Sequence, residues 1–119
     1  MARDAAFITT WGASVPGREG KSLEVFMEFM QTTGKWAAEG KVSPAEVYFN
    51  ADGSEGMAIV KGKSDVLLDV WESDENQKLL AKASMIIQDL KAHMYYTGDE
   101  EIHRGTQLFS QAGSELGYM

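Results

Sequence analysis

The chain of 119 residues suits one domain with a single core, and the absence of cysteine excludes disulfides, thiolate metal sites and thiol catalysis. Its net charge of −7, with eleven scattered Lys and Arg residues, disfavours binding to nucleic acid or to an acidic membrane surface. There is no signal-peptide pattern and no apolar run of membrane-spanning length, so we expect a cytoplasmic protein.

Three segments in the first half of the chain predict strands. Residues 5–13, AAFITTWGA, are rich in β-branched and aromatic side chains. Residues 42–50 form a second predicted strand, in which Pro44 favours an edge position. The turn sequence ADGSEG separates it from a third strand at 56–62, so we expect a β-hairpin.

A long amphipathic helix is predicted between the first two strands. It begins between residues 16 and 23 and ends near Glu39, before Gly40. Its apolar side chains cover an arc of about 200°, twice the stripe of an ordinary surface helix. We therefore expect one flank to touch the sheet and the other to touch the second helix region, the tail or another subunit. Gly34 lies within the apolar sector, where a missing side chain permits close approach.

The second half of the chain predicts two helical pieces, about 64–72 and 74–83, with caps at Ser64 and Asp74. The next segment, about 85–96, fits a helix or a strand, and its periodicity slightly favours a helix. The remaining tail is polar and weakly patterned, with a short helix predicted over 99–110.

Several segments together carry a resemblance to the dimeric α/β-barrel superfamily, and within it to small uncharacterised bacterial proteins. They are SVPGRE, LEVFMEFM, EVYFNADGSEGMAIVKG and KLLAKASMIIQDLKAHMYYTGD. The resemblance implies an α+β, ferredoxin-like β-α-β-β-α-β fold, with helices on one face of a four-stranded antiparallel sheet. It makes 85–96 a strand and residues 1–98 the domain. The tail, 99–119, would pack on the domain or on the dimer mate.

Sorting the predicted strand residues by side gives two sets. The set expected to face the helices is apolar and mostly small: Ala6, Ile8, Ala45, Val47, Phe49, Ala58, Val60, Leu90, Ala92 and Met94. The opposite set carries large amphipathic side chains: Phe7, Thr9, Trp11, Glu46, Tyr48, Asn50, Met57, Ile59, Lys61, Asp89, Lys91, His93 and Tyr95. A solvated sheet face should be polar, so we expect two sheets to stack face to face in a C2 homodimer, as the superfamily implies.

Trp71 and the following SDENQKLLAKA resemble a segment of the haem-degrading monooxygenases in this superfamily. There a histidine follows the tryptophan, but this chain has none before His93. The asparagine of that family's first strand also has no counterpart in AAFITTWGA. We therefore expect Trp71 to belong to the core, and we expect no cofactor.

The residues best suited to chemistry are His93, Tyr48 and Trp11, which become catalytic candidates if the dimer interior holds a pocket. Trp11, Tyr48, Trp71 and Tyr95 are the candidates for lining a ligand pocket. The two histidines lack the partners that a metal site needs, so we expect none. The leading hypothesis is a homodimer that binds a small apolar or aromatic metabolite. The alternative is a cofactor-independent monooxygenase or isomerase.

Overall fold

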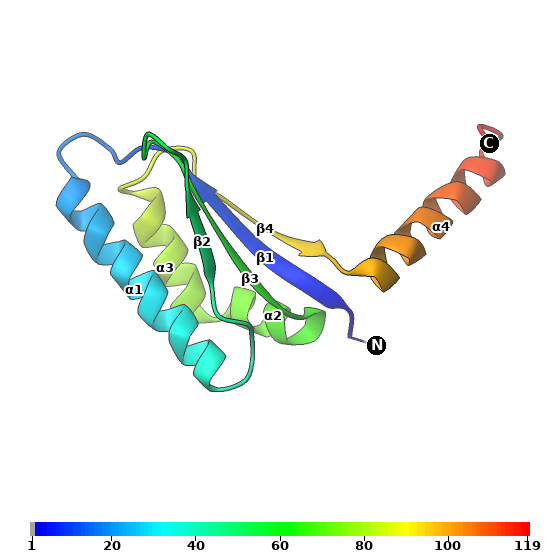
Figure 1. The fold of residues 1–119 in the computed structure, drawn as a ribbon, viewed down its shortest axis with the longest axis horizontal. Coiled ribbons are helices and arrows are strands. Elements are labelled where there is room, and N and C mark those ends of the chain that lie inside the picture. The colour runs from blue at the N-terminus through cyan, green and yellow to red at the C-terminus, as the bar shows by residue number, and fades with distance from the viewer. Residues whose placement is uncertain (1) are drawn as a thin grey trace.

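The structure, a computed structural model, describes residues 2–119 (Figure 1). Its elements follow the predicted order, with the second helix divided in two and a further helix at the end. They are β1 (Asp4–Trp11), α1 (Glu19–Ala38), β2 (Glu46–Phe49), β3 (Gly56–Lys63), α2 (Ser64–Glu72), α3 (Asp74–Ser84), β4 (Lys91–Tyr96) and α4 (Asp99–Glu115).

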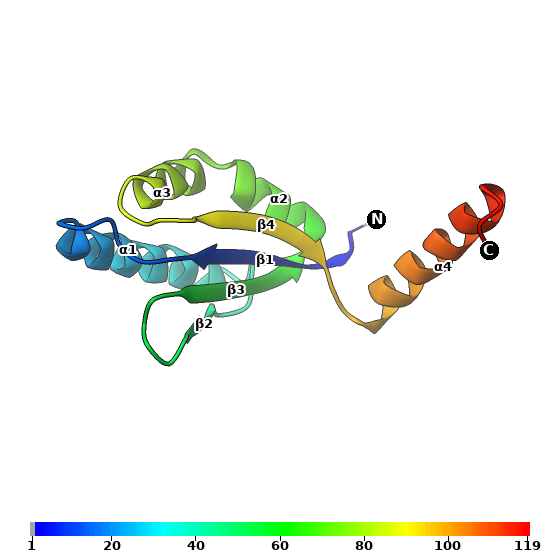
Figure 2. The ribbon, with the colours of Figure 1, turned by 90° about the horizontal axis from the view of Figure 1, so that it is seen from above.

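The strands form one antiparallel sheet in the order β2-β3-β1-β4. Helices α1, α2 and α3 lie against one face, whereas no described helix covers the face that Figure 2 looks onto. This arrangement confirms the predicted ferredoxin-like α+β fold. The ambiguous segment is a strand from Lys91 onward, and residues 85–90 form the turn that leads into it.

In β1, the residues that face the helices are not the ones predicted from the sequence. Phe7 lies opposite Val60 in β3 and Met94 in β4, and residues that pair directly across strands share a face. The odd-numbered residues of β1 therefore face the helices, and the expectation that Ala6 and Ile8 do so is wrong. Apolar residues occupy both sides of this strand, so the pattern of apolar and polar residues does not indicate which side faces the helices.

The core lies where the odd-numbered side of β1 meets α2 and the end of α1. Its buried members are Ala5, Phe7, Trp36, Val42, Val60, Leu67 and Val70. Trp71 packs edge-on against Phe7, with ring centroids 4.4 Å apart, which is a favourable geometry for two aromatic rings. This contact confirms the core position predicted for Trp71.

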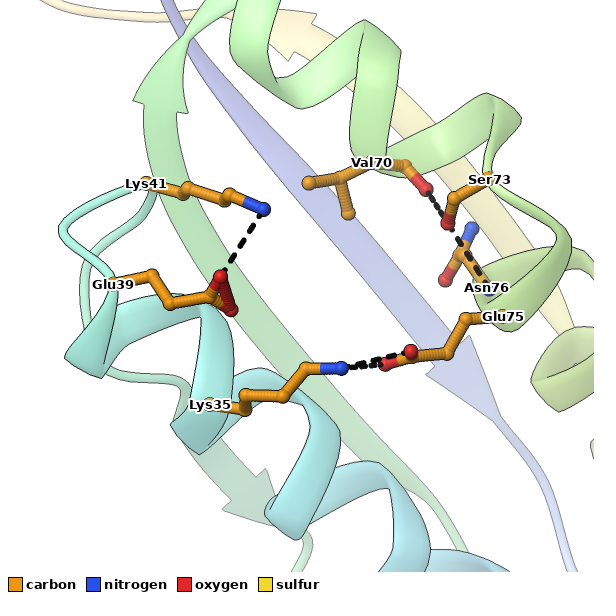
Figure 3. Close-up of polar contacts among 7 residues, drawn as sticks. All are labelled: Lys35, Glu39, Lys41, Val70, Ser73, Glu75 and Asn76. Atoms are coloured by element: carbon orange, nitrogen blue, oxygen red, sulfur yellow. Dashed lines mark hydrogen bonds and ion pairs between the residues drawn. The ribbon is translucent and has the colours of Figure 1, made fainter.

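Helices α1 and α3 are joined on their exposed sides by ion pairs. Lys35 Nζ lies 2.8 Å from a Glu75 carboxylate oxygen (Figure 3), and Lys82 Nζ lies 3.0 Å from Glu28. A Cβ built at Gly34 would have open space around it. The close approach expected at Gly34 is therefore absent within the described chain.

Helix α4 extends the chain away from the sheet and the other helices (Figures 1 and 2). It continues beyond the predicted end at residue 110 to Glu115, and none of its residues is buried. Near its beginning, Glu101 lies 3.6 Å from Arg3. Among residues 2–119, no helix combines the length and the apolarity needed to cross a lipid bilayer.

Candidate functional site

A cavity of about 300 Å³ lies between the helix-facing side of the sheet and helices α1 and α3. On the sheet, Thr9 lies opposite Ala58 and Ala92, so the row across the central strands carries small side chains. Phe7 and Trp11 precede and follow Thr9 on the same side of β1. A row of small side chains therefore lies between the bulky Phe7 and Trp11, and it leaves space between the sheet and the helices.

Aromatic rings from β1, β2 and α1 form one wall of this cavity. The centroid of Trp11 lies 6.3 Å from that of Phe26 and 6.2 Å from that of Phe49. Phe26 also stacks with Phe29 at 6.4 Å. The Trp11 ring covers Gly56, where an added Cβ would lie 2.4 Å from the indole. The absence of a side chain at Gly56 thus allows the indole to lie on the sheet.

The cavity has an exposed mouth and a buried inner end. The exposed lining residues are Ala13, Glu19, Leu23, Phe49 and Gly53, and the buried ones are Phe7, Thr9, Asn76 and Leu79. This arrangement accounts for the wide apolar arc of α1. Part of the surplus arc, including Leu23 and Phe26, lines the cavity.

Thr9 lines the cavity, and its own hydroxyl oxygen is buried without a partner in the described protein. The residue is 6% exposed, and no group within residues 2–119 forms a hydrogen bond with its Oγ1. Most buried polar groups in folded proteins are hydrogen-bonded, because an unpaired one carries a desolvation cost. The Thr9 hydroxyl is therefore an unusual feature in a mainly apolar surrounding.

Asn76 is a second buried polar residue of the cavity lining. Ser73 caps α3 by accepting a hydrogen bond from the Asn76 backbone N–H (Figure 3), which places Asn76 in the first turn of the helix. Its Nδ2 donates to the carbonyl of Trp71 at 3.2 Å. This bond fixes the amide orientation, because the reverse orientation would set two acceptors against each other. The Oδ1 atom receives no hydrogen bond from the described residues.

Glu19 at the mouth is the one ionisable side chain among the described residues that line the cavity. Hydrogen bonds from its own backbone N–H and from that of Gly17 lower the pKa of the Glu19 carboxyl, since they stabilise the charged form. The same lining contains no Lys, Arg or His. The cavity therefore offers no cation to neutralise a buried anion.

The candidate site residues predicted from the sequence lie on two different faces of the sheet. Trp11 lines the cavity, whereas Tyr48, Tyr95 and His93 lie on the opposite, open face of the sheet. The Tyr48 hydroxyl donates to Glu46 at 2.8 Å, and this hydrogen bond to a carboxylate raises the pKa of Tyr48.

His93 and Tyr95 pack together on the open face, with centroids 6.2 Å apart. Trp71 supports the core beneath Phe7 and is not part of the cavity lining. Within residues 2–119, no three His, Cys, Asp or Glu side chains gather as a metal site requires. The sequence candidates thus occupy separate places and form no common site.

Two polar lining residues, Thr9 and Asn76, were not identified from the sequence. A threonine between Phe7 and Trp11 at strand spacing was the available signal for the first, and it was assigned to the wrong face. For the second, the signal was an asparagine three residues after Ser73, in the first turn of a predicted helix. Neither signal indicates a cavity until the sheet register is known.

Neither a protein-family profile nor a curated protein sequence matches the chain. Solved structures do match its fold. Rv0793 from Mycobacterium tuberculosis superposes with a TM-score of 0.64 at 17% identity, covering 81% of this chain and 96% of that one. A mutant of the cofactor-independent oxygenase SnoaB from Streptomyces nogalater gives 0.62 at 10% identity, covering 81% and 94%. The hydroxynitrile lyase from Passiflora edulis gives 0.62 at 8% identity, covering 82% and 95%.

The two enzymes among these neighbours, an oxygenase and a hydroxynitrile lyase, carry out different reactions, so the likeness concerns architecture. It agrees with the resemblance that the sequence segments carry. The chain has the ferredoxin-like α+β fold that these solved structures share.

Proposed function

We propose that the protein binds a small, uncharged, largely aromatic molecule in the cavity between the sheet and helices α1 and α3. The observation that carries this proposal is a cavity of about 300 Å³ with aromatic walls and few polar residues in its lining, among them the buried Asn76. This volume is at the lower end of the range for ligand sites, about 300–1,000 Å³. Ligand sites commonly combine an apolar lining with a few polar groups that orient the ligand.

The alternative, a cofactor-independent monooxygenase or isomerase, has less support from the side chains of the cavity. Such a reaction uses an acid or base within hydrogen-bonding reach of the substrate. Of the described lining, Glu19 is the one ionisable residue, and it lies at the mouth with a lowered pKa. Tyr48 and His93 lie on the other face of the sheet. These positions favour binding over acid–base catalysis.

We also propose a C2 homodimer in which the open sheet faces of two copies stack. Tyr48 and Tyr95 are 53% and 49% exposed on this face, beside Met57 and Ile59. Contiguous large apolar side chains on a sheet face are typical of a contact surface. The projecting helix α4 supports the same proposal, since its apolar residues contact little of their own domain and a short isolated helix is marginal in water.

Binding can be tested with naphthalene as a neutral aromatic probe, followed by chemical-shift changes in two-dimensional NMR spectra. We expect the shifts to concentrate on the cavity lining. Ala83 lines the cavity and Ala81 is exposed on the same helix. Ala83→Phe should therefore abolish saturable binding, and Ala81→Phe should leave it unchanged. Saturable binding that survives Ala83→Phe would place the ligand elsewhere and contradict the proposal.

The dimer can be tested by size-exclusion chromatography with light scattering at micromolar concentration. Tyr95 and Tyr96 are neighbours on β4 that point to opposite faces of the sheet. Tyr95→Asp should produce a monomer because it places a charge in the proposed interface, whereas Tyr96→Asp should remain dimeric. A monomeric mass for the unmodified protein would disprove the proposed assembly.

A further inference from the structure

We propose that the α4 helices of two copies of this chain pair side by side and antiparallel, in an interface separate from the open sheet face. Helix α4 extends away from its own domain (Figure 2), and none of its residues is buried. Ile102 and Phe109 of α4, and Leu116 at its C-cap, are 61%, 70% and 71% exposed. The inference goes beyond the proposed ligand and the proposed sheet dimer, and it depends on neither of them.

One side of α4 alternates large and small residues at the spacing of a coiled-coil seam. Ile102, Phe109 and Leu116 recur at every seventh position, and Gly105 and Ala112 lie between them. Steps of three and four residues therefore alternate along this side, and residues at these spacings share one face of a helix. The seam thus consists of large side chains with a gap after each of the first two.

The gap at Gly105 has no explanation within the chain that contains it. A Cβ built at Gly105 would meet no described atom within 4 Å, so no neighbour in the chain requires glycine there. Glycine inside a helix is also less favourable than alanine. Close approach of a second helix at this point would account for the missing side chain.

A second copy of α4 fills these gaps when it runs in the opposite direction. In an antiparallel pair related by a two-fold axis, Phe109 can lie opposite the partner's Gly105. In the same register, Ile102 lies opposite the partner's Ala112. Each layer then combines one large and one small residue, which allows close packing without voids. A parallel pair would set the two Phe109 rings against each other and leave a void between the glycines.

The charges of α4 also favour the antiparallel direction. Its first turn carries Asp99, Glu100 and Glu101. A parallel pair would bring two such acidic turns together, whereas the antiparallel register separates them by about 20 Å. One approach of like charges remains, because Glu115 comes near the partner's first turn. Added salt should therefore strengthen the pairing.

The surface available on α4 suits a weak self-association. The exposed fractions of Ile102, Leu108, Phe109 and Leu116 correspond to roughly 500 Å² per copy, taking about 200 Å² for a large side chain. Two copies would thus bury about 1,000 Å², the lower limit for a specific interface. We expect this pairing at higher protein concentration than the sheet dimer. The match of large to small residues within one sequence identifies a second copy as the occupant.

Single cysteines can map the pairing, because the chain has no cysteine of its own. Thr106 lies beside the two-fold axis in the proposed register, so two Thr106→Cys chains should be joined by a short bismaleimide. Gln107 points away from the seam and provides the matched control. We expect Thr106→Cys to link about tenfold faster than Gln107→Cys at submillimolar concentration. Equal rates for the two variants would overturn the proposal.

The orientation is tested by disulfide formation under mild oxidation. Ile102→Cys should form a disulfide with Ala112→Cys in a mixture of the two proteins, but not with itself. A disulfide between two Ile102→Cys chains would show a parallel pair and overturn the proposed register. Thr106→Cys should still be linked when combined with Tyr95→Asp. Loss of linking there would overturn the separation from the sheet interface.

A substitution in the seam tests the pairing without cross-linking. Light scattering of the unmodified protein should show a mass that rises between micromolar and submillimolar concentration. Gly105→Leu should abolish this rise, because its side chain would meet the partner's Phe109, while its helix propensity is better than that of glycine. Gln107→Leu should retain the rise. A mass that does not depend on concentration, or that rises equally in Gly105→Leu, would overturn α4 pairing and leave the ligand and sheet-dimer proposals intact.

Discussion

Replacing Thr9 with valine should stabilise the protein in the absence of ligand. Valine keeps the branched shape of threonine and its strand preference but exchanges the hydroxyl for a methyl group. The hydroxyl is buried and has no protein partner within residues 2–119, so the folded state carries its desolvation cost of about 1–3 kcal/mol. Removing that cost should raise the free energy of unfolding by about the same amount.

Urea denaturation, followed by tryptophan fluorescence and circular dichroism, measures this change. The transition midpoint should rise while the slope of the free energy against urea stays constant, since the surface exposed on unfolding is unchanged. Thr9→Ser is expected to show no such gain, because it retains the unpaired hydroxyl. All variants should be compared at one protein concentration, because an assembly that forms from folded chains makes stability depend on concentration.

A loss of stability in Thr9→Val greater than about 0.5 kcal/mol would refute the reasoning. It would mean that the hydroxyl already makes a favourable hydrogen bond, whose removal costs the native state.

Gly56→Ala should destabilise the protein by about 1–3 kcal/mol, because the new Cβ would meet the Trp11 ring and force it to move; unchanged tryptophan emission and an unchanged urea midpoint would contradict this. Gly34→Ala should instead stabilise by about 1 kcal/mol, since it gains helix propensity in open space, and a lower thermal midpoint would show that another chain approaches there. Tyr48 should ionise at higher pH than an ordinary tyrosine, because its proton is held by the Glu46 carboxylate and its pKa is raised. In difference titrations at 295 nm against Tyr48→Phe, Glu46→Gln should lower this pKa, and an unchanged titration would argue against the hydrogen bond. Because the folded-state pKa of Tyr48 is raised, its contribution to stability is complete below the unfolded value and is lost as the pH rises through the folded value.

The order of elements could be predicted from the sequence because it depends on local signals. The helix-period pattern of α1 and its glycine stop, and the turn sequence before Gly56, each act over a few residues. The predicted caps Ser64 and Asp74 mark the starts of α2 and α3, but they are the first helical residues, and the N-cap positions are Lys63 and Ser73. The segment before β4 was ambiguous, because its apolar residues fit both periods. The superfamily resemblance, and not the periodicity, led to the correct choice.

The cavity could not be predicted in the same way, because it depends on pairing between distant strands. The row of Thr9 with Ala58 and Ala92 exists only in the final register. The first strand carries apolar residues on both sides, so nothing local indicated that Trp11 would face α1 and not a second sheet. A shift of one residue exchanges the two faces of a strand, and for this strand that was the error.

The layout of β1 has an evolutionary consequence. The row containing Phe7 belongs to the hydrophobic core, although Phe7 itself also lines the cavity. The next row along the same strand contains Thr9, which lines the cavity without belonging to that core. Substitutions in the second row can alter which compounds are accepted while the first row continues to hold the domain together. Related chains could thus diverge in chemical preference through a few small side chains on the central strands and keep a common architecture.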